Sequence, residues 1–304
     1  MNLDRKVEQL IQKFNPQIKL LRTWKLHGGV SANVMGMECL KANGQTEKMV
    51  LRQYGEVDYR RNPNVAADEY KLLEILKYNG LPVPAPYYFD QSDEIISTPY
   101  VVIEFINGEM ELTPSNIPNF ICSFATILAD IHRVNSSTFD VSFLAKQEDY
   151  YKEKLENKPL KLDDSLNEGP IRDVLESVWP LPQKNNSVIL HGDFWPGNML
   201  WKDGKIMAVI DWEDAALGDP LSDLANSRLE VLWAFGMEAM NNFTQKYTSL
   251  MPDIDLKNLP YWDLIAALRP ASQLSLWGLE KSKEEEMRER HMLFVTQAFS
   301  SLKP

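Results

Sequence analysis

The chain has 304 residues, of which 44% are hydrophobic and 25% charged, and its formal net charge at pH 7 is −11. This length suits one large domain or two lobes, and the composition is that of a soluble globular protein. The negative charge argues against nucleic acid or an anionic membrane as a partner, and it favours a cationic small molecule. With two cysteines, a charged N-terminus and no apolar run of membrane-spanning length, we expect a cytoplasmic protein without disulfides or a signal peptide.

The N-terminal third has the pattern of a small β-rich lobe with one main helix. In chain order we expect an amphipathic helix, a group of strands, a second helix and a further strand, at 1–15, 18–57, 64–79 and 99–109. The dipeptide Asn43–Gly44 inside the strand group is a strong hairpin signal.

The pattern becomes helical at about residue 106. A helix is expected at 119–135, followed by a polar stretch of little periodicity to about residue 180, then a motif-bearing hairpin, and then helices to the end. We therefore predict an α+β fold with two domains, a small β-rich lobe at 1–105 and a larger, mostly helical lobe at 106–304, which the motifs below mark as the nucleotide-binding lobe and the catalytic and substrate-binding lobe.

The most informative motif is LHGDFWPGNML at 190–200. Gly192 and Gly197 have the glycine spacing of a P-loop, but Asn198 and Met199 stand where a P-loop needs lysine and then serine or threonine. Pro196 also removes a backbone N–H that a phosphate cradle would use. These departures exclude the P-loop interpretation.

Two polar residues of the same motif have the spacing of a kinase catalytic loop. Asp193 and Asn198 stand five positions apart, as the catalytic base and a metal-binding asparagine do in kinases. Asp203–Gly204 predicts a type I′ hairpin, whose register brings Asp211 to the same end as Asn198. A carboxylate and an amide oxygen suit Mg²⁺, so we predict Asp193 as the base and Asn198 and Asp211 as metal ligands. The structural alternatives are a turn cap, a loop amide and a strand-end carboxylate.

At this point a resemblance is clear. HGDFWPGN, followed by VIDWEDAALGDPLSDLA, resembles the aminoglycoside phosphotransferase and choline kinase family, which has a protein-kinase-like two-lobe fold. Weaker matches in the right order are LHGGVSAN at 26–33, MVLR at 49–52, ADEYKLL at 67–73, IEFINGE at 103–109 and LADIH at 128–132. The resemblance covers about residues 20–300, and it implies Mg²⁺ and ATP, or GTP, as cofactors.

The family's nucleotide site carries over residue by residue. The resemblance implies a nucleotide site made of Gly28, Gly29, Ser31, Asn33 and Arg52, of Glu69 as the residue that pairs with Arg52, and of the backbone at Glu104, Phe105 and Ile106. Arg52 stands where the family usually has a phosphate-binding lysine, and its planar fork favours bidentate contacts. Lys48 is the alternative cation, four residues earlier on the same strand face. A plain hairpin turn is the alternative for the glycine loop, and a solvated carboxylate is the alternative for Glu69.

Other members of the motifs are expected to be structural. His191 and His132 are expected to pack, the first against the catalytic loop and the second in the core. Asp219 and Asp223 resemble the family's structural carboxylates, which cap a helix and hold the catalytic loop.

The acceptor is expected to be a small molecule. The segment from Asp211 to Gly218 is too short for the activation segment of a protein kinase. An aminoglycoside, a macrolide, a choline-like amine and a sugar all remain open. Candidate acceptor contacts mix aromatic walls with charges: Trp195, Glu213, Trp233, Trp262, Arg269 and Trp277. The alternative role for these side chains is packing in the core.

The alternative function for the whole protein is a non-catalytic pseudokinase or binding scaffold. Arg52, in place of the usual lysine, is the one indication of it.

Overall fold

The computed structural model describes residues 3–26 and 33–302. The internal contacts of the chain separate two compact units, each of which joins segments that lie apart in the sequence. We call them unit 1 (Met1–Glu109 and Leu200–Glu213) and unit 2 (Met110–Met199 and Asp214–Pro304). The predicted domain bounds, 1–105 and 106–304, stay a prediction. They place residues 200–213 in the C-terminal domain, whereas the internal contacts place this segment in unit 1.

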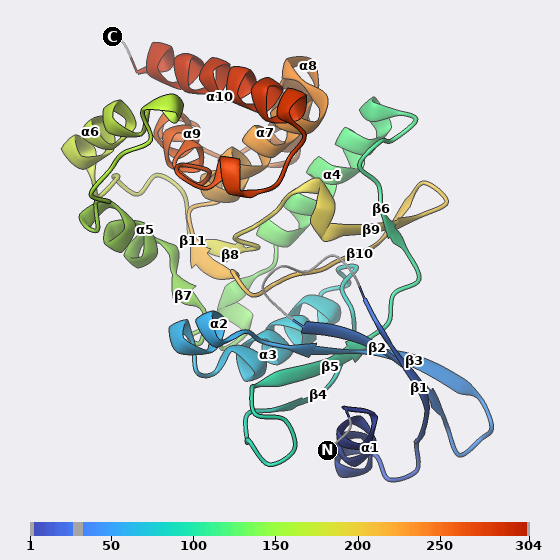
Figure 1. The fold of residues 1–304 in the computed structure, drawn as a ribbon. Helices are drawn as coiled ribbons and strands as arrows, with labels where there is room; N and C mark the ends of the chain where they lie inside the picture. The colour runs from blue at the N-terminus through green and yellow to red at the C-terminus, as the bar shows by residue number, and fades with distance from the viewer. Residues whose placement is uncertain (1–2, 27–32, 303–304) are drawn as a thin grey trace. The chain divides into compact units, whose positions relative to one another are not determined.

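Unit 1 is built on an antiparallel sheet (Figure 1). Among the described residues its order is β1-β2-β3-β5-β4, with bounds Lys19–Lys25, Asn33–Leu40, Thr46–Gln53, Tyr100–Glu104 and Pro86–Asp90. The turn between β2 and β3 contains Asn43–Gly44, where Gly44 has a φ of +81°, as the dipeptide predicts. β3 lies inside the sheet, so Arg52 near its end is flanked by Val34 of β2 and Val101 of β5.

The described residues of the N-terminal part of unit 1 also form the helices α1 (Leu3–Phe14), α2 (Glu56–Arg61) and α3 (Val65–Tyr78). Val7, Leu10 and Ile11 of α1 follow the helical spacing and are fully buried, in one cluster with Met37 and other residues of the sheet. α3 packs against β4 and β5. Together with its apolar side chains it carries Glu69 into the interior, where that residue is 5% exposed.

The hairpin predicted after the motif is present. β9 (Met199–Lys202) and β10 (Lys205–Val209) are joined at Asp203–Gly204, both with positive φ, as a type I′ turn requires. They form a sheet of order β10-β9-β6, in which β6 is Glu109–Met110. The N–H of Val209 donates to the carbonyl of Pro82 at 2.7 Å, which ties the hairpin to unit 1. Beyond it, Asp211 has a left-handed backbone with a φ of +70°.

Unit 2 is mainly helical (Figure 1). Its helices are α4 (Ile117–His132), α5 (Gln147–Glu156), α6 (Glu168–Val178), α7 (Leu221–Phe235), α8 (Met237–Leu250), α9 (Leu259–Ala267) and α10 (Lys281–Ser301). Short 3₁₀ helices are η1 (Ser136–Thr138), η2 (Asp164–Leu166), η3 (Pro196–Asn198) and η4 (Leu274–Leu276). Strands β7 (Ala145–Lys146) and β8 (Val188–Leu190) flank β11 (Ala216–Gly218), which runs parallel to β7 and antiparallel to β8. None of the helices in the described ranges is long and apolar enough to cross a membrane.

The polar stretch that ends at about residue 180 contains two helices that its sequence pattern did not indicate. In α5 the buried side chains are Gln147, Tyr151 and Leu155, one per turn, so the apolar stripe is too narrow to stand out. In α6 the buried set of four includes Glu168 and Arg172, which pair with each other at 2.9 Å. Charged residues at buried positions therefore hide the periodicity of this helix.

Helix α7 holds the motif in place. It is buried around most of its circumference, so its polar side chains lie inside the protein. Its buried residues include the polar side chains of Ser222, Asp223, Asn226, Ser227 and Arg228. Buried polar groups need partners inside the protein. Two of those on α7, Asp223 and Ser227, find them in the segment that follows β8.

Candidate functional site

The segment 191–198 of unit 2 is anchored to α7 through backbone groups. The carboxylate of Asp223 accepts the N–H of His191 at 2.7 Å and the N–H of Gly192 at 3.0 Å. The hydroxyl of Ser227, one helical turn further on, donates to the carbonyl of Phe194 at 2.8 Å. Gly192 has a φ of +82°, and a Cβ there would overlap the carbonyl oxygen of Asp214. Only glycine therefore fits this bend without strain.

Asp223 is itself held by a buried histidine. His132 of α4 places its Nε2 3.2 Å from Asp223, and its Nδ1 lies 2.6 Å from the hydroxyl of Tyr247. Burial opposes ionisation of Asp223, but the hydrogen bond and charge of His132, with His191, hold the pKa of this carboxyl below its usual value. The packing role expected for His132 is confirmed by its 3% exposure. Asp219 accepts the N–H of Leu221 at 3.0 Å at the start of α7.

Asp193 is fixed on both of its carboxylate oxygens. Its Oδ1 accepts from Nη2 of Arg269 at 2.6 Å, and its Oδ2 accepts from Nδ2 of Asn198 at 3.2 Å. The same Asn198 amide donates to the backbone carbonyl of Asp193 at 2.9 Å, and Nη1 of Arg269 donates to the carbonyl of Gly192 at 2.7 Å. The side chains of Asp193 and Arg269 are 32% and 30% exposed, so this pair is reachable by solvent.

Asn198 and Trp195 complete the segment. Asn198 is 6% exposed and lies in the 3₁₀ turn η3. The ring of Trp195 covers Gly197 so closely that a Cβ at that position would overlap it. The glycines of the motif therefore allow close approaches by Asp214 and Trp195.

Unit 1 contains a second charged cluster, centred on Arg52. Its Nη1 donates to Glu69 at 2.7 Å, and its Nη2 donates to Glu213 at 2.6 Å and to Asp211. The Tyr54 hydroxyl donates to the same oxygen of Glu69. Burial opposes the charge of Arg52, but Glu69 and Asp211 outweigh it and raise the pKa of the guanidinium. The pairing of Arg52 with Glu69 that the resemblance implies is thus present.

The alternative cation, Lys48, lies outside this cluster. It is exposed, whereas Arg52 is 6% exposed on the same strand. Its ammonium lies 6.0 Å from the ring centre of Trp24 and 5.6 Å from that of Phe105. Within unit 1, Arg52 is therefore the cation that meets Glu69 and Asp211.

The remaining predicted nucleotide contacts are only partly described. Gly28, Gly29 and Ser31 lie outside the described residues. Asn33 is exposed and its amide donates to Gln53 at 3.1 Å. The backbone N–H of Glu104 donates to the carbonyl of Ala85 at 2.8 Å, and the carbonyl of Ile106 accepts from Gly108 at 3.1 Å.

The predicted acceptor contacts divide into different environments. Trp233 and Trp262 are 3% and 5% exposed and pack among aromatic rings, so the structure favours the core-packing alternative for both. Trp277 is 46% exposed and lies against Trp233. Glu213 joins Arg52, and Arg269 joins Asp193.

Two titratable residues near Asp193 and Arg269 were not singled out in the sequence. Burial, and then the charge of Asp193, raise the pKa of Glu230 on α7 to about 8. Burial, and then the charges of Arg269 and Arg172, lower the pKa of Lys154 on α5 to about 8. No motif marks either residue. Tyr54, in contrast, follows Arg52 by two positions, so strand alternation was a signal for its place beside Glu69.

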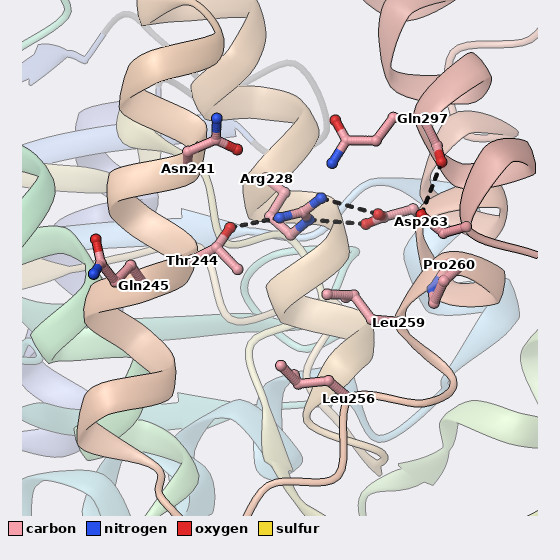
Figure 2. A pocket seen from close by; sticks show the side chains of 10 residues that line it. Arg228, Asn241, Thr244, Gln245, Leu256, Leu259, Pro260, Asp263 and Gln297 are labelled. Atoms are coloured by element: carbon pink, nitrogen blue, oxygen red, sulfur yellow. Dashed lines mark hydrogen bonds and ion pairs between the residues drawn. The ribbon is translucent and has the colours of Figure 1, made fainter.

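A cavity of about 410 Å³ lies elsewhere in unit 2, among α7, α8, α9 and α10 (Figure 2). In it Arg228 forms a bidentate pair with Asp263 at 3.0 and 3.1 Å and donates to Thr244 at 2.5 Å. Both partners are 4% exposed, and burial raises the pKa of Asp263 to about 6 despite Arg228. The guanidinium already has its partners, which makes the pair a structural link between helices.

The fold and the motif define the class of the protein. Residues 40–253 match the model of the phosphotransferase enzyme family, and the chain belongs to this family. The predicted family and the predicted kinase-like α+β fold are both confirmed.

Curated relatives fall into two groups. An aminoglycoside 3′-phosphotransferase of Escherichia coli is 24% identical over 76% of the chain and 91% of its own length. Acyl-CoA dehydrogenase family member 10 of Mus musculus is 26% identical over 60% of the chain, and family member 11 of Homo sapiens is 25% identical over 62%. The matched segment spans only 18% and 26% of these two proteins.

Solved structures share the fold over nearly the whole chain. Aminoglycoside phosphotransferase APH(4)-Ia has a TM-score of 0.64 at 19% identity, covering 99% of this chain and 100% of its own. Macrolide 2′-phosphotransferase MphH from Brachybacterium faecium has a TM-score of 0.62 at 19% identity, covering 95% and 98%.

Proposed function

We propose that the protein is an ATP- and Mg²⁺-dependent phosphotransferase that moves the γ-phosphate to a hydroxyl of a small molecule. The observation that carries this proposal is Asp193. Its carboxylate is one-third exposed and is held on both oxygens, by Arg269 and Asn198, within the part of the chain that matches the family model. A carboxylate fixed in this way suits a base, because proton transfer depends on geometry first.

In this reaction Asp193 accepts the proton of the acceptor hydroxyl. The hydroxyl oxygen forms a bond to the γ-phosphorus, and the bond from that phosphorus to the ADP oxygen breaks. Phosphoryl transfer requires little covalent chemistry from the protein, and positioning and charge neutralisation provide most of the catalysis. The anchoring of 191–194 to Asp223 and Ser227 serves this positioning.

Nucleotide binding is assigned to Arg52 and Glu69 together with the loop and linker residues named from the resemblance. Related solved structures support a nucleotide site, since a thermostable mutant of APH(4)-Ia was solved with AMP-PNP and hygromycin B, and APH(2")-IIia was solved with GDP and kanamycin. Asn198 and Asp211 offer the amide and carboxylate oxygens that Mg²⁺ prefers, so their chemistry fits this ion. The ion would neutralise the charge of the phosphates.

The acceptor is proposed to be a small molecule that carries a hydroxyl. The short segment after Asp211 supports this, as do the aminoglycosides in the solved relatives. We propose a substrate screen over aminoglycosides, macrolides, choline-like amines and sugars, read by ATP consumption. Hydroxylated acyl-CoA thioesters belong in the same screen because several relatives are named for acyl-CoA.

The test of the proposal is Asp193→Asn, which keeps the size of the side chain but cannot accept the proton. We expect kcat to fall about 100- to 10,000-fold, the range for loss of a general base. Asp173→Asn, at an exposed position of α6, is the matched control and should keep full activity. Equal phosphate transfer by Asp193→Asn and the unchanged protein would contradict the mechanism.

Nucleotide binding separates this proposal from a pseudokinase that binds no nucleotide. A ligand that binds the native state raises its stability, by about 2.7 kcal/mol at one hundred times its Kd. We expect ATP with Mg²⁺ to raise the melting temperature of both the unchanged protein and Asp193→Asn. No shift in either protein would favour a scaffold.

A further inference from the structure

Arg269 holds the catalytic segment at two atoms. It follows α9, and its adjacent Nη1 and Nη2 groups donate to the carbonyl of Gly192 at 2.7 Å and to Oδ1 of Asp193 at 2.6 Å. Because the guanidinium is rigid and planar, these contacts fix the Asp193 side chain relative to the backbone before it.

The second oxygen of Asp193 is held from another direction. Asn198 donates to Oδ2 at 3.2 Å and, with the same amide nitrogen, to the Asp193 carbonyl at 2.9 Å. A carboxylate gripped at both oxygens cannot rotate freely about its last side-chain bond. Asn198 belongs to the same segment as Asp193, whereas Arg269 follows α9 and anchors the carboxylate from outside that segment.

The partial exposure of this pair supports an orienting role for Arg269. The groups that act on its guanidinium are Asp193, Tyr151 on α5, Asp214 and Glu230 on α7. Asp193 forms an ion pair with it at 2.6 Å. A partly exposed pair contributes little to folding, typically about 0–1 kcal/mol. Its geometric effect on a base is larger, because a misplacement of about 1 Å can cost about 100-fold in rate.

We propose that Arg269 is a positioning residue of the phosphotransfer reaction, which orients the Asp193 carboxylate for the acceptor hydroxyl. This proposal rests on the proposed function, and it differs from the acceptor contact predicted for Arg269 from the sequence. The residue acts through Asp193, so its loss should change the rate of transfer more than the binding of either substrate.

The first arm of the experiment is kinetic. We expect Arg269→Ala to lower kcat about 10- to 100-fold while the KM values for ATP and acceptor change less than about twofold. Arg269→Lys should recover part of the rate, and so should added guanidinium ion in Arg269→Ala but not in Asp193→Asn. An unchanged kcat overturns the proposal, and so does a large rise in acceptor KM without rescue, which would mark Arg269 as an acceptor contact.

Arg133→Ala is the matched control. Arg133 also donates to one carboxylate, Asp130, and one backbone carbonyl, Leu250, but both partners lie outside 191–198. This variant should keep the kcat of the unchanged protein. An equal loss of kcat in both variants would show a general effect of losing an arginine contact, and it would also overturn the proposal.

The second arm needs no turnover. Hydrogen exchange of the peptide that covers 190–199 should rise in Arg269→Ala and stay unchanged in Arg133→Ala. If no acceptor is phosphorylated by the unchanged protein, the proposed function fails, and this arm alone decides whether Arg269 holds the segment. Equal exchange in Arg269→Ala and the unchanged protein overturns the positioning role.

Discussion

Arg52 in unit 1 and Arg269 in unit 2 each pair with a predicted catalytic or metal-binding carboxylate, but in different surroundings. The Arg52 side chain is 7% exposed and meets Glu69, Asp211 and Glu213, whereas the Arg269 side chain is 30% exposed and pairs with Asp193. A buried charge needs its partners, because removing one leaves another without compensation. A partly exposed pair can be lost at little cost in stability. The comparison therefore separates an arginine whose buried contacts should contribute to stability from one whose contact should mainly orient a reacting group.

The largest effect on stability is expected at Glu69. Glu69→Ala removes a buried partner of Arg52 and the acceptor of the Tyr54 hydroxyl, and we expect a loss of about 3–5 kcal/mol in the free energy of unfolding. Urea denaturation measures this change. Glu74→Ala, at an exposed position of the same helix, is the control and should stay within about 0.5 kcal/mol. A loss below about 1 kcal/mol at Glu69 would break the comparison.

An intermediate effect is expected at the ion pair of Lys13 and Asp90, where one partner is buried and the other is exposed. Asp90 is 8% exposed and accepts from Lys13 at 2.7 Å. Burial opposes its charge, but Lys13 and Ser92 outweigh burial and lower its pKa to about 2. A carboxyl group whose pKa is lowered by folding stabilises the fold at a pH above about 4, the pKa of the group in the unfolded chain. This contribution is lost as the pH falls towards 2.

Asp90→Asn tests this contribution. We expect the unfolding free energy to fall by about 2 kcal/mol at pH 7 and by much less at pH 2, measured in urea at both values. Glu94→Gln, which removes the exposed partner of Lys13, should change it little at either pH. A loss at Asp90 that does not depend on pH would show that the charge is not responsible.

The smallest effect is expected for the stability of Arg269→Ala. Its pair with Asp193 is about one-third exposed, so we expect a loss of about 1 kcal/mol or less in urea denaturation. A loss as large as that of Glu69→Ala would remove the distinction between the two arginines. It would also mean that a lower kcat of Arg269→Ala reflects unfolding of the variant and not the orientation of Asp193.

Local patterns predicted the parts of the site that lie close together in the sequence. Asp203–Gly204 predicted its hairpin because this dipeptide adopts positive φ at both positions. The motif likewise placed Asp193 beside Asn198. The family resemblance then pointed to the pair of Arg52 and Glu69, which a strand and a helix bring together.

Contacts between segments that are far apart in the chain could not be predicted from local sequence patterns. Arg269 meets Asp193 across 76 positions, and nothing near either residue indicates the other. Trp233 and Trp262 lie on helices, where apolar spacing does not distinguish a pocket wall from the core. The narrow stripe of α5 and the charged buried positions of α6 hid two helices for a related reason, because periodicity reports only apolar contrast.

The discontinuity of unit 1 has a consequence for the order in which the chain is made. Arg52 and Asp211 are 159 positions apart, with the first segment of unit 2, Met110–Met199, between them. During synthesis Glu69 emerges soon after Arg52, but the hairpin that bonds to Pro82 and the carboxylates that follow it come much later. Domains generally fold as units from the N-terminus as they emerge. Unit 1 therefore cannot complete its charged centre until residue 213 has been made.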